Sequence, residues 1–139
     1  MADNAHELRP KAGDSEKVTI NLGYVDLGHI DLLVREGLYS NRTDLIRTAI
    51  RDQLERHAAA VDRSVTRQSL DPGLRHYSRA DLEAVLAAGE KLRIHVLGLA
   101  TIAPDVTPEL ALATIDPLVV PGALHAPSAV KAALAGRIR

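Results

Sequence analysis

The segment from Lys17 to Leu22 alternates polar and apolar side chains without a break. Successive side chains of a β-strand point to opposite faces, so Val18, Ile20 and Leu22 would form one apolar face. A strand this short is not stable alone, because the hydrogen-bonding groups along its edges need a partner. The chain continues into helical patterns and offers no matching second strand. We therefore expect this strand to pair with its copy in a second chain, antiparallel about a two-fold axis.

Two helical patterns follow this segment. In the first, apolar residues recur at helical spacing from Leu27 to Val34, and Gly37 stands where a left-handed residue commonly ends a helix. This pattern predicts a helix from about residue 26 to residue 36, with Asp26 as its N-cap.

The second helical pattern begins after a short turn. Asn41 is a favourable N-cap, and the side chain of Asp44 can reach back to the Asn41 amide in a variant of the capping box. One strand and two helices of this size would leave much apolar surface exposed in a monomer, so we expect dimerisation to be close to obligatory. The apolar stripe of the second helix consists of Leu45, Ile46, Ala49, Ile50 and Leu54.

This order of strand, helix, turn and capped helix resembles a ribbon-helix-helix domain of the CopG/Arc/MetJ type over residues 17–57. The junction from Gly37 to Arg47 is similar to that family's connection between its two helices. The resemblance implies an intertwined homodimer whose two strands form an antiparallel ribbon that enters the major groove of double-stranded DNA. The dimer core would contain Val18, Ile20, Leu22, Leu33, Ile46 and Ile50.

The resemblance also implies which residues contact the DNA operator. Lysine can donate to guanine, asparagine can pair with adenine through two hydrogen bonds, and threonine can bond to a base or touch a thymine methyl. Unpaired amides at a helix N-terminus suit a phosphate oxygen. The alternative is that the polar row is only the solvated face of a dimerisation ribbon. The implied base contacts are Lys17, Thr19 and Asn21, and the implied phosphate contacts are Asn41, Arg42 and Thr43.

Composition limits the compartment and the source of DNA affinity. The 139 residues include no cysteine, which excludes disulfides and fits a cytoplasmic location. No apolar run reaches membrane-spanning length, and we expect no signal peptide before the strand. The net charge is −1, and residues 1–57 contain eight Lys and Arg against ten Asp and Glu. We therefore expect DNA affinity to come from locally placed cations, or from several dimers on adjacent half-sites.

The second half of the chain contains an internal repeat. Gly73, Gly98 and Gly122 are 25 and 24 residues apart, and each connects a short strand pattern to a helical pattern. A period in the twenties with one strand and one helix per unit is typical of a small solenoid with parallel strands. Asp71-Pro72 suits a strand at the edge of the sheet better than a central one. A compact α/β domain without stacked repeats is the alternative.

Each helical pattern of the second half has a recognisable start, and two of them have a glycine at the end. A Ser-x-x-Asp capping box opens the first, a threonine before proline opens the second, and proline opens the third. The expected helix starts are Ser78, Thr107 and Pro127, and the expected helix ends are Gly89 and Gly136.

The sequence therefore predicts an α+β protein in four parts. We expect the ribbon-helix-helix resemblance to stop at the second part and not to extend into the last. The parts are a flexible arm over residues 1–16, the ribbon-helix-helix domain over residues 17–57, a connector over residues 58–68 and a β/α repeat domain over residues 69–139.

The function that these observations favour is that of a sequence-specific transcriptional regulator. We expect no enzymatic activity, no cofactor and no metal, because no catalytic triad, phosphate loop or metal-binding spacing is recognisable. The repeat domain would form a higher oligomer or respond to an effector of unknown identity. Two alternatives remain: an antitoxin whose second half binds a toxin, and a structural assembly protein whose repeats stack between copies.

Overall fold

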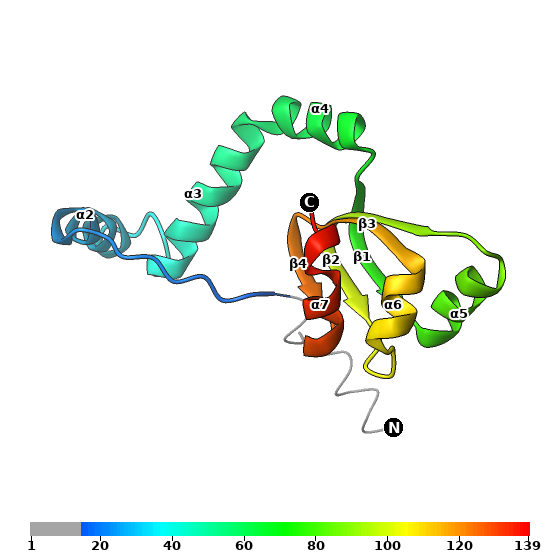
Figure 1. Cartoon of the computed structure of the whole chain (residues 1–139). Coiled ribbons are helices and arrows are strands. Elements are labelled where there is room, and N and C mark those ends of the chain that lie inside the picture. The colour runs from blue at the N-terminus through cyan, green and yellow to red at the C-terminus, as the bar shows by residue number, and fades with distance from the viewer. Residues whose placement is uncertain (1–14) are drawn as a thin grey trace, which may run out of the picture. The chain divides into compact units, whose positions relative to one another are not determined.

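The computed structural model describes residues 15–139, which fall into two compact units (Figure 1). One unit comprises residues 17–63, and the other includes residues 64–139. Helices and parallel strands are both present, so the predicted α+β class is confirmed. The flexible arm expected over residues 1–16 lies almost entirely outside the described residues. Within residues 15–139, no helix has the length and apolar character that crossing a membrane requires.

The first unit consists of helices without a strand of its own among the described residues. It contains α2 (Tyr24–Arg35), α3 (Arg42–Arg56) and the first part of α4 (Ala58–Gln68), which continues into the second unit. The residues expected to form a connector, 58–68, are therefore helical. The segment preceding α2 forms no strand within a single chain, and the expected pairing with a second copy stays a prediction.

Helix α2 begins two residues before the predicted start. Its N-cap is Gly23, which has no side chain to cap the helix, so the prediction of Asp26 as the N-cap is wrong. Asp26 instead lies in the first turn, where a carboxylate interacts favourably with the helix dipole. The predicted end is correct: Gly37 has a φ of 86°, and its amide donates to the Val34 carbonyl over 3.0 Å. This left-handed residue turns the chain towards α3.

The second unit is a parallel sheet flanked by short helices. Strand β2 is central: it pairs with β1 on one side and with both β3 and β4 on the other, always in parallel. Strand β1 lies at the edge, as Asp71-Pro72 predicts. The elements are β1 (Asp71–Tyr77), α5 (Arg79–Ala87), β2 (Leu92–Ile102), α6 (Pro108–Thr114), β3 (Ile115–Val119), β4 (Gly122–His125), α7 (Ser128–Leu134) and the 3₁₀ helix η2 (Ala135–Arg137).

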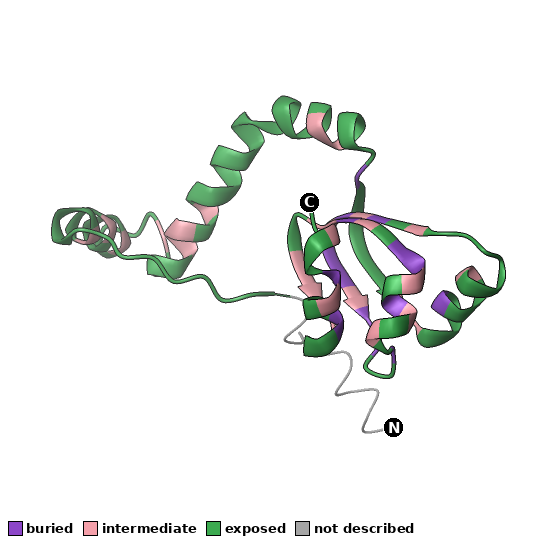
Figure 2. Cartoon of the chain, in the orientation of Figure 1, coloured by how far each residue is buried: buried purple, intermediate pink, exposed green. Residues whose placement is uncertain are grey.

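The core of this unit lies between the sheet and its helices. Helix α6 contacts both α5 and α7, so the three helices follow the order of the strands. Figure 2 shows the buried residues gathered in this unit. Burial of these side chains removes enough apolar surface from water to stabilise the unit within one chain. The largest fully buried apolar side chains are Leu82, Ile94, Val96, Ile115, Leu118, Val130 and Leu134.

The three repeat glycines lie next to one another across the sheet. Gly73 pairs in register with Gly98, and Gly98 pairs in register with Gly122. Their φ angles of 127°, 137° and 120° are in a region that other residues rarely adopt. A β-carbon on Gly98 would collide with the Gly73 carbonyl oxygen, and one on Gly122 would collide with that of Gly98. Only glycine allows the strands to approach this closely.

The helix starts of the second unit are those that the sequence predicts. Ser78 and Asp81 form a complete capping box, in which each side chain accepts a hydrogen bond from the other residue's amide. Thr107 caps α6 with proline at the next position, and Pro127 is the N-cap of α7. The predicted end at Gly136 is wrong, because α7 stops at Leu134 and the chain continues into η2.

Candidate nucleic-acid interface

The polar and apolar rows of residues 17–22 are both exposed within a single chain. Lys17, Thr19 and Asn21, the expected base contacts, are all exposed. Val18 and Ile20 retain 80% and 61% of their full exposure. Solvent therefore reaches two rows of opposite character on one segment, and the apolar row is the one that a partner would need to cover.

The helices of this unit also leave apolar side chains uncovered. Among the described residues of α2, α3 and α4, no side chain is classed as buried. Leu33 and Ile50, both expected in a dimer core, are 37% and 53% exposed, and Ile46 is half-buried. Leu54 on the same stripe of α3 is 59% exposed. A single copy of this unit therefore lacks a core of its own, unlike the second unit.

The N-terminus of α3 is held by two hydrogen bonds between side chains and main-chain amides. The side-chain oxygen of Asn41 accepts from the Asp44 amide over 2.8 Å, so the predicted N-cap is confirmed. The Asp44 carboxylate accepts from the amide of Ser40 over 2.9 Å, one residue before the predicted partner Asn41. These bonds fix the first turn of α3.

Arg42 forms an ion pair with α2. Its guanidinium donates two hydrogen bonds to the Asp31 carboxylate, over 2.7 and 2.8 Å. The hydrogen bond from Arg42 holds the pKa of Asp31 below its usual range, and the carboxylate raises the pKa of Arg42. Because the folded-state pKa of Asp31 is lowered, the pair stabilises the unit at neutral pH and loses this effect as the pH falls through that pKa. Arg42 thus connects α2 to α3.

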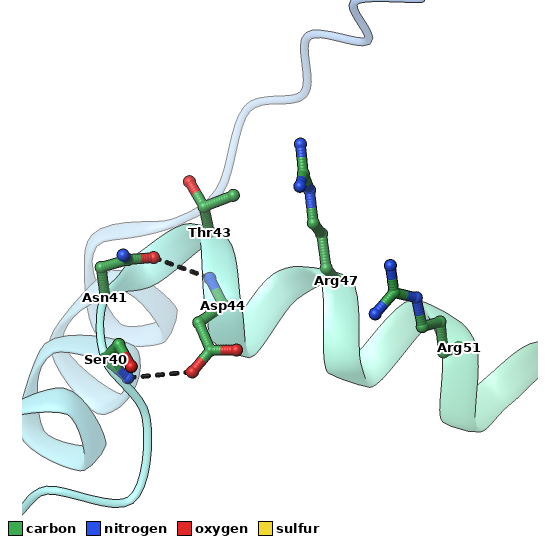
Figure 3. A pocket seen from close by; sticks show the side chains of 6 residues that line it. All are labelled: Ser40, Asn41, Thr43, Asp44, Arg47 and Arg51. Atoms are coloured by element: carbon green, nitrogen blue, oxygen red, sulfur yellow. Dashed lines mark hydrogen bonds between the residues drawn. The ribbon is translucent and has the colours of Figure 1, made fainter. Parts of the chain in front are cut away.

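A shallow concavity of about 390 Å³ lies beside the first turns of α3 (Figure 3). Thr43, Arg47 and Arg51 lie one helical turn apart and project from the same side of the helix. Arg47 and Arg51 are exposed, and Asp44, which also lines the concavity, has its carboxylate turned back to the Ser40 amide. The concavity therefore combines two guanidinium groups, a hydroxyl and a helix N-terminus, all of which are suited to an anion.

Arg47 and Arg51 are absent from the contacts that the resemblance implies. The signal was present in the sequence as a Thr-Arg-Arg series at positions 43, 47 and 51, each one helical turn from the next. The three expected phosphate contacts do not lie together. Asn41 and Thr43 line the concavity, whereas the side chain of Arg42 is directed to Asp31.

Comparison with known protein families shows which family the chain belongs to. A profile of the ribbon-helix-helix transcriptional regulator family matches residues 13–131, which is most of the chain. The chain therefore belongs to this family, and the resemblance expected for residues 17–57 is confirmed. The expectation that it stops before the second half is wrong, since the match continues through most of residues 69–139. Comparison with curated proteins and with solved structures finds no match.

Proposed function

We propose that the protein is a cytoplasmic, sequence-specific transcriptional regulator that binds operator DNA as a homodimer. The observation that carries the proposal is the alternation in residues 17–22, where a polar and an apolar row are both exposed. Pairing of this segment with its copy would bury Val18 and Ile20 and leave Lys17, Thr19 and Asn21 facing the bases. A family of transcriptional regulators accords with this role and with a protein that is not an enzyme.

The phosphate contacts in this proposal differ from those that the family resemblance implies. The amides at the start of α3 would bind one phosphate together with Asn41 and Thr43. Arg47 and Arg51 would extend the contact along the backbone, because they line the same concavity. Arg42 would contribute indirectly, by fixing the N-terminus of α3 against α2 through Asp31.

The second unit in this proposal is a short repeat domain that brings dimers together. Three strand–helix units with glycines in register support the interpretation as a repeat. Contacts between dimers on adjacent half-sites would raise the affinity of a chain with a net charge of only −1. Binding of an effector to this unit remains a prediction.

Replacing Asn21 by Ala tests base recognition. A bidentate contact to adenine provides about 1–3 kcal/mol of discrimination, so the variant should lose preference at one position in each half-site. Sequencing of DNA selected from a random duplex pool measures the preference, and sedimentation measures the dimer as a control. The regulator proposal fails if the wild-type protein recovers all sequences equally, and the assignment of Asn21 fails if the selected motif is unchanged.

Replacing Arg47 and Arg42 by Ala separates direct from indirect roles at α3. Each phosphate contact contributes roughly 0.9 to the slope of log affinity against log salt, so Arg47→Ala should lower the slope by about 2 for a dimer. Arg42→Ala should keep the slope and lower the thermal stability of the first unit, because its guanidinium is paired with Asp31. Anisotropy titrations at several salt concentrations measure the slope for each variant, and thermal denaturation measures the stability. A lower slope for Arg42→Ala and an unchanged slope for Arg47→Ala would show that Arg42, and not Arg47, contacts the phosphate.

A further inference from the structure

The outer edge of β1 has a backbone conformation that its own surroundings do not require. In β2 and β4, the left-handed glycine faces the carbonyl oxygen of the glycine on the preceding strand. Gly73 has the same conformation, with φ at 127°, but β1 is an edge strand and has no preceding strand among residues 64–139. Strand β1 therefore has the backbone conformation of the repeat but lacks the preceding strand that β2 and β4 have.

Arg75 occupies the place of that neighbour. A β-carbon on Gly73 would meet Nη1 of Arg75 at 3.3 Å, where the equivalent position of Gly98 meets a main-chain carbonyl. The same guanidinium donates to the Leu74 carbonyl over 3.0 Å and to the Asp71 carboxylate over 2.8 Å. Because Gly73 O faces β2 and successive carbonyls alternate, the Leu74 carbonyl points outward. Arg75 and Asp71 are both exposed, so this covering is weak and easily displaced.

The opposite end of the sheet offers a matching edge. Gly122 on β4 is exposed, and its carbonyl stands one step beyond that of Gly98 in the same series. The chain after η2 bridges only to β3, through Leu118 and Ile138. A copy translated along the series would place its Gly122 against Gly73 and its Ala123 against Leu74, since Gly98 and Leu99 relate to β1 in that register.

Charge distinguishes the two ends of the unit. The first strand–helix unit, residues 69–90, contains four carboxylates against two arginines, and the middle unit, residues 91–114, is balanced. The last unit, residues 115–139, contains one carboxylate against three cations. An acidic first end and a basic last end attract each other head to tail and repel their own kind. The acidic residues at one end are Asp71, Asp81, Glu83 and Glu90, and the basic residues at the other are Lys131 and Arg139, because the Arg137 guanidinium donates to the Leu112 and Ile115 carbonyls.

We propose that the second unit binds another copy of itself head to tail, with the β1 edge of one chain paired in parallel with the β4 edge of the next and Arg75 displaced from between them. Leu74 and Leu86, which are 61% and 50% exposed on the first strand–helix unit, would become covered in this contact. Head-to-tail contacts do not close on two copies, so ribbon dimers would be joined into larger assemblies. The proposal rests on residues other than the DNA contacts and can fail or hold independently of them.

Sedimentation of the full-length chain tests the assembly. The mean mass of the wild-type protein should exceed that of a dimer and rise with concentration. Salt near 1 M, where the Debye length is about 3 Å, should reduce it. Leu74→Lys should hold the mass at the dimer, whereas the matched variant Leu112→Lys, at an exposed position of α6 in the middle unit, should behave like the wild type. Equal masses for the wild type and Leu74→Lys would overturn the proposal.

Cysteine cross-linking tests the register, because the chain contains no cysteine. A mixture of Leu74→Cys and Ala123→Cys chains with a short bis-maleimide should give a cross-linked pair that neither variant gives alone. Cross-linking of Leu74→Cys with itself would show antiparallel pairing of two β1 edges and would overturn the head-to-tail arrangement. So would an equal yield when Leu112→Cys replaces Ala123→Cys. Binding of each variant to a duplex long enough for one ribbon dimer, measured separately, should be retained, because contacts between dimers do not contribute there.

Discussion

Replacing Ile20 by Glu should leave the protein unable to dimerise and unable to bind its operator. Ile20 is 61% exposed within one chain and lies on the apolar row that the proposed ribbon buries between two copies. Burial of such a side chain contributes about 2 kcal/mol, and a two-fold axis repeats the loss in both chains. A carboxylate in its place would be buried without a cation, which adds several kcal/mol to the cost of association. Sedimentation and anisotropy with operator DNA measure the two effects.

Thr19→Glu is the matched control for this change. It introduces the same side chain at the neighbouring position, on the polar row that would face the DNA. The dimer should persist, while a carboxylate close to the phosphates should abolish binding. The paired result separates the two faces of one segment. If Ile20→Glu still dimerises, or if both variants lose the dimer, the antiparallel ribbon is the wrong assembly.

The features that the sequence predicts correctly are those that depend on residues close together in the chain. The N-caps at Asn41, Ser78 and Thr107 each bond to an amide three residues later, so residue types at fixed spacing determine them. Gly37 ends α2 for a similar reason, since a left-handed residue there strongly favours glycine. The Gly23 N-cap has no such signal, because glycine has no side chain to bond to an amide, so the sequence does not indicate where α2 begins.

The features that the sequence does not predict depend on partners far along the chain or on another chain. Asp31 and Arg42 are eleven residues apart, and nothing local indicates that Arg42 would pair with α2 rather than reach a phosphate. Asp71-Pro72 indicates that β1 is an edge strand, but the place of the Arg75 side chain beside Gly73 depends on that edge having no neighbouring strand among residues 64–139. The ribbon is a further case, because one copy cannot display a strand pairing that needs two.

The in-register glycines make Gly98→Ala a strongly destabilising single-methyl change in the second unit. Gly98 lies on the central strand with φ at 137°, a conformation that costs about 1–3 kcal/mol for other residues. The added β-carbon would also collide with the Gly73 carbonyl, and such overpacking adds about 1–3 kcal/mol. The free energy of opening this unit, measured by hydrogen exchange of the β2 amides, should fall by about 3 kcal/mol or more, so these amides should exchange faster.

Gly73→Ala is the control that separates the cost of backbone conformation from the cost of close approach. The φ of Gly73 is 127°, so the conformational cost is similar, but its β-carbon would meet only the end of the Arg75 side chain at 3.3 Å. A flexible guanidinium held by an exposed ion pair can move away at little cost. Gly73→Ala should therefore lower protection of the β2 amides by about 1–3 kcal/mol, and distinctly less than Gly98→Ala does. If both variants lose the same amount of protection, backbone conformation alone would account for the need for glycine at these positions. In that case β1 and β2 would not approach as closely as their register requires.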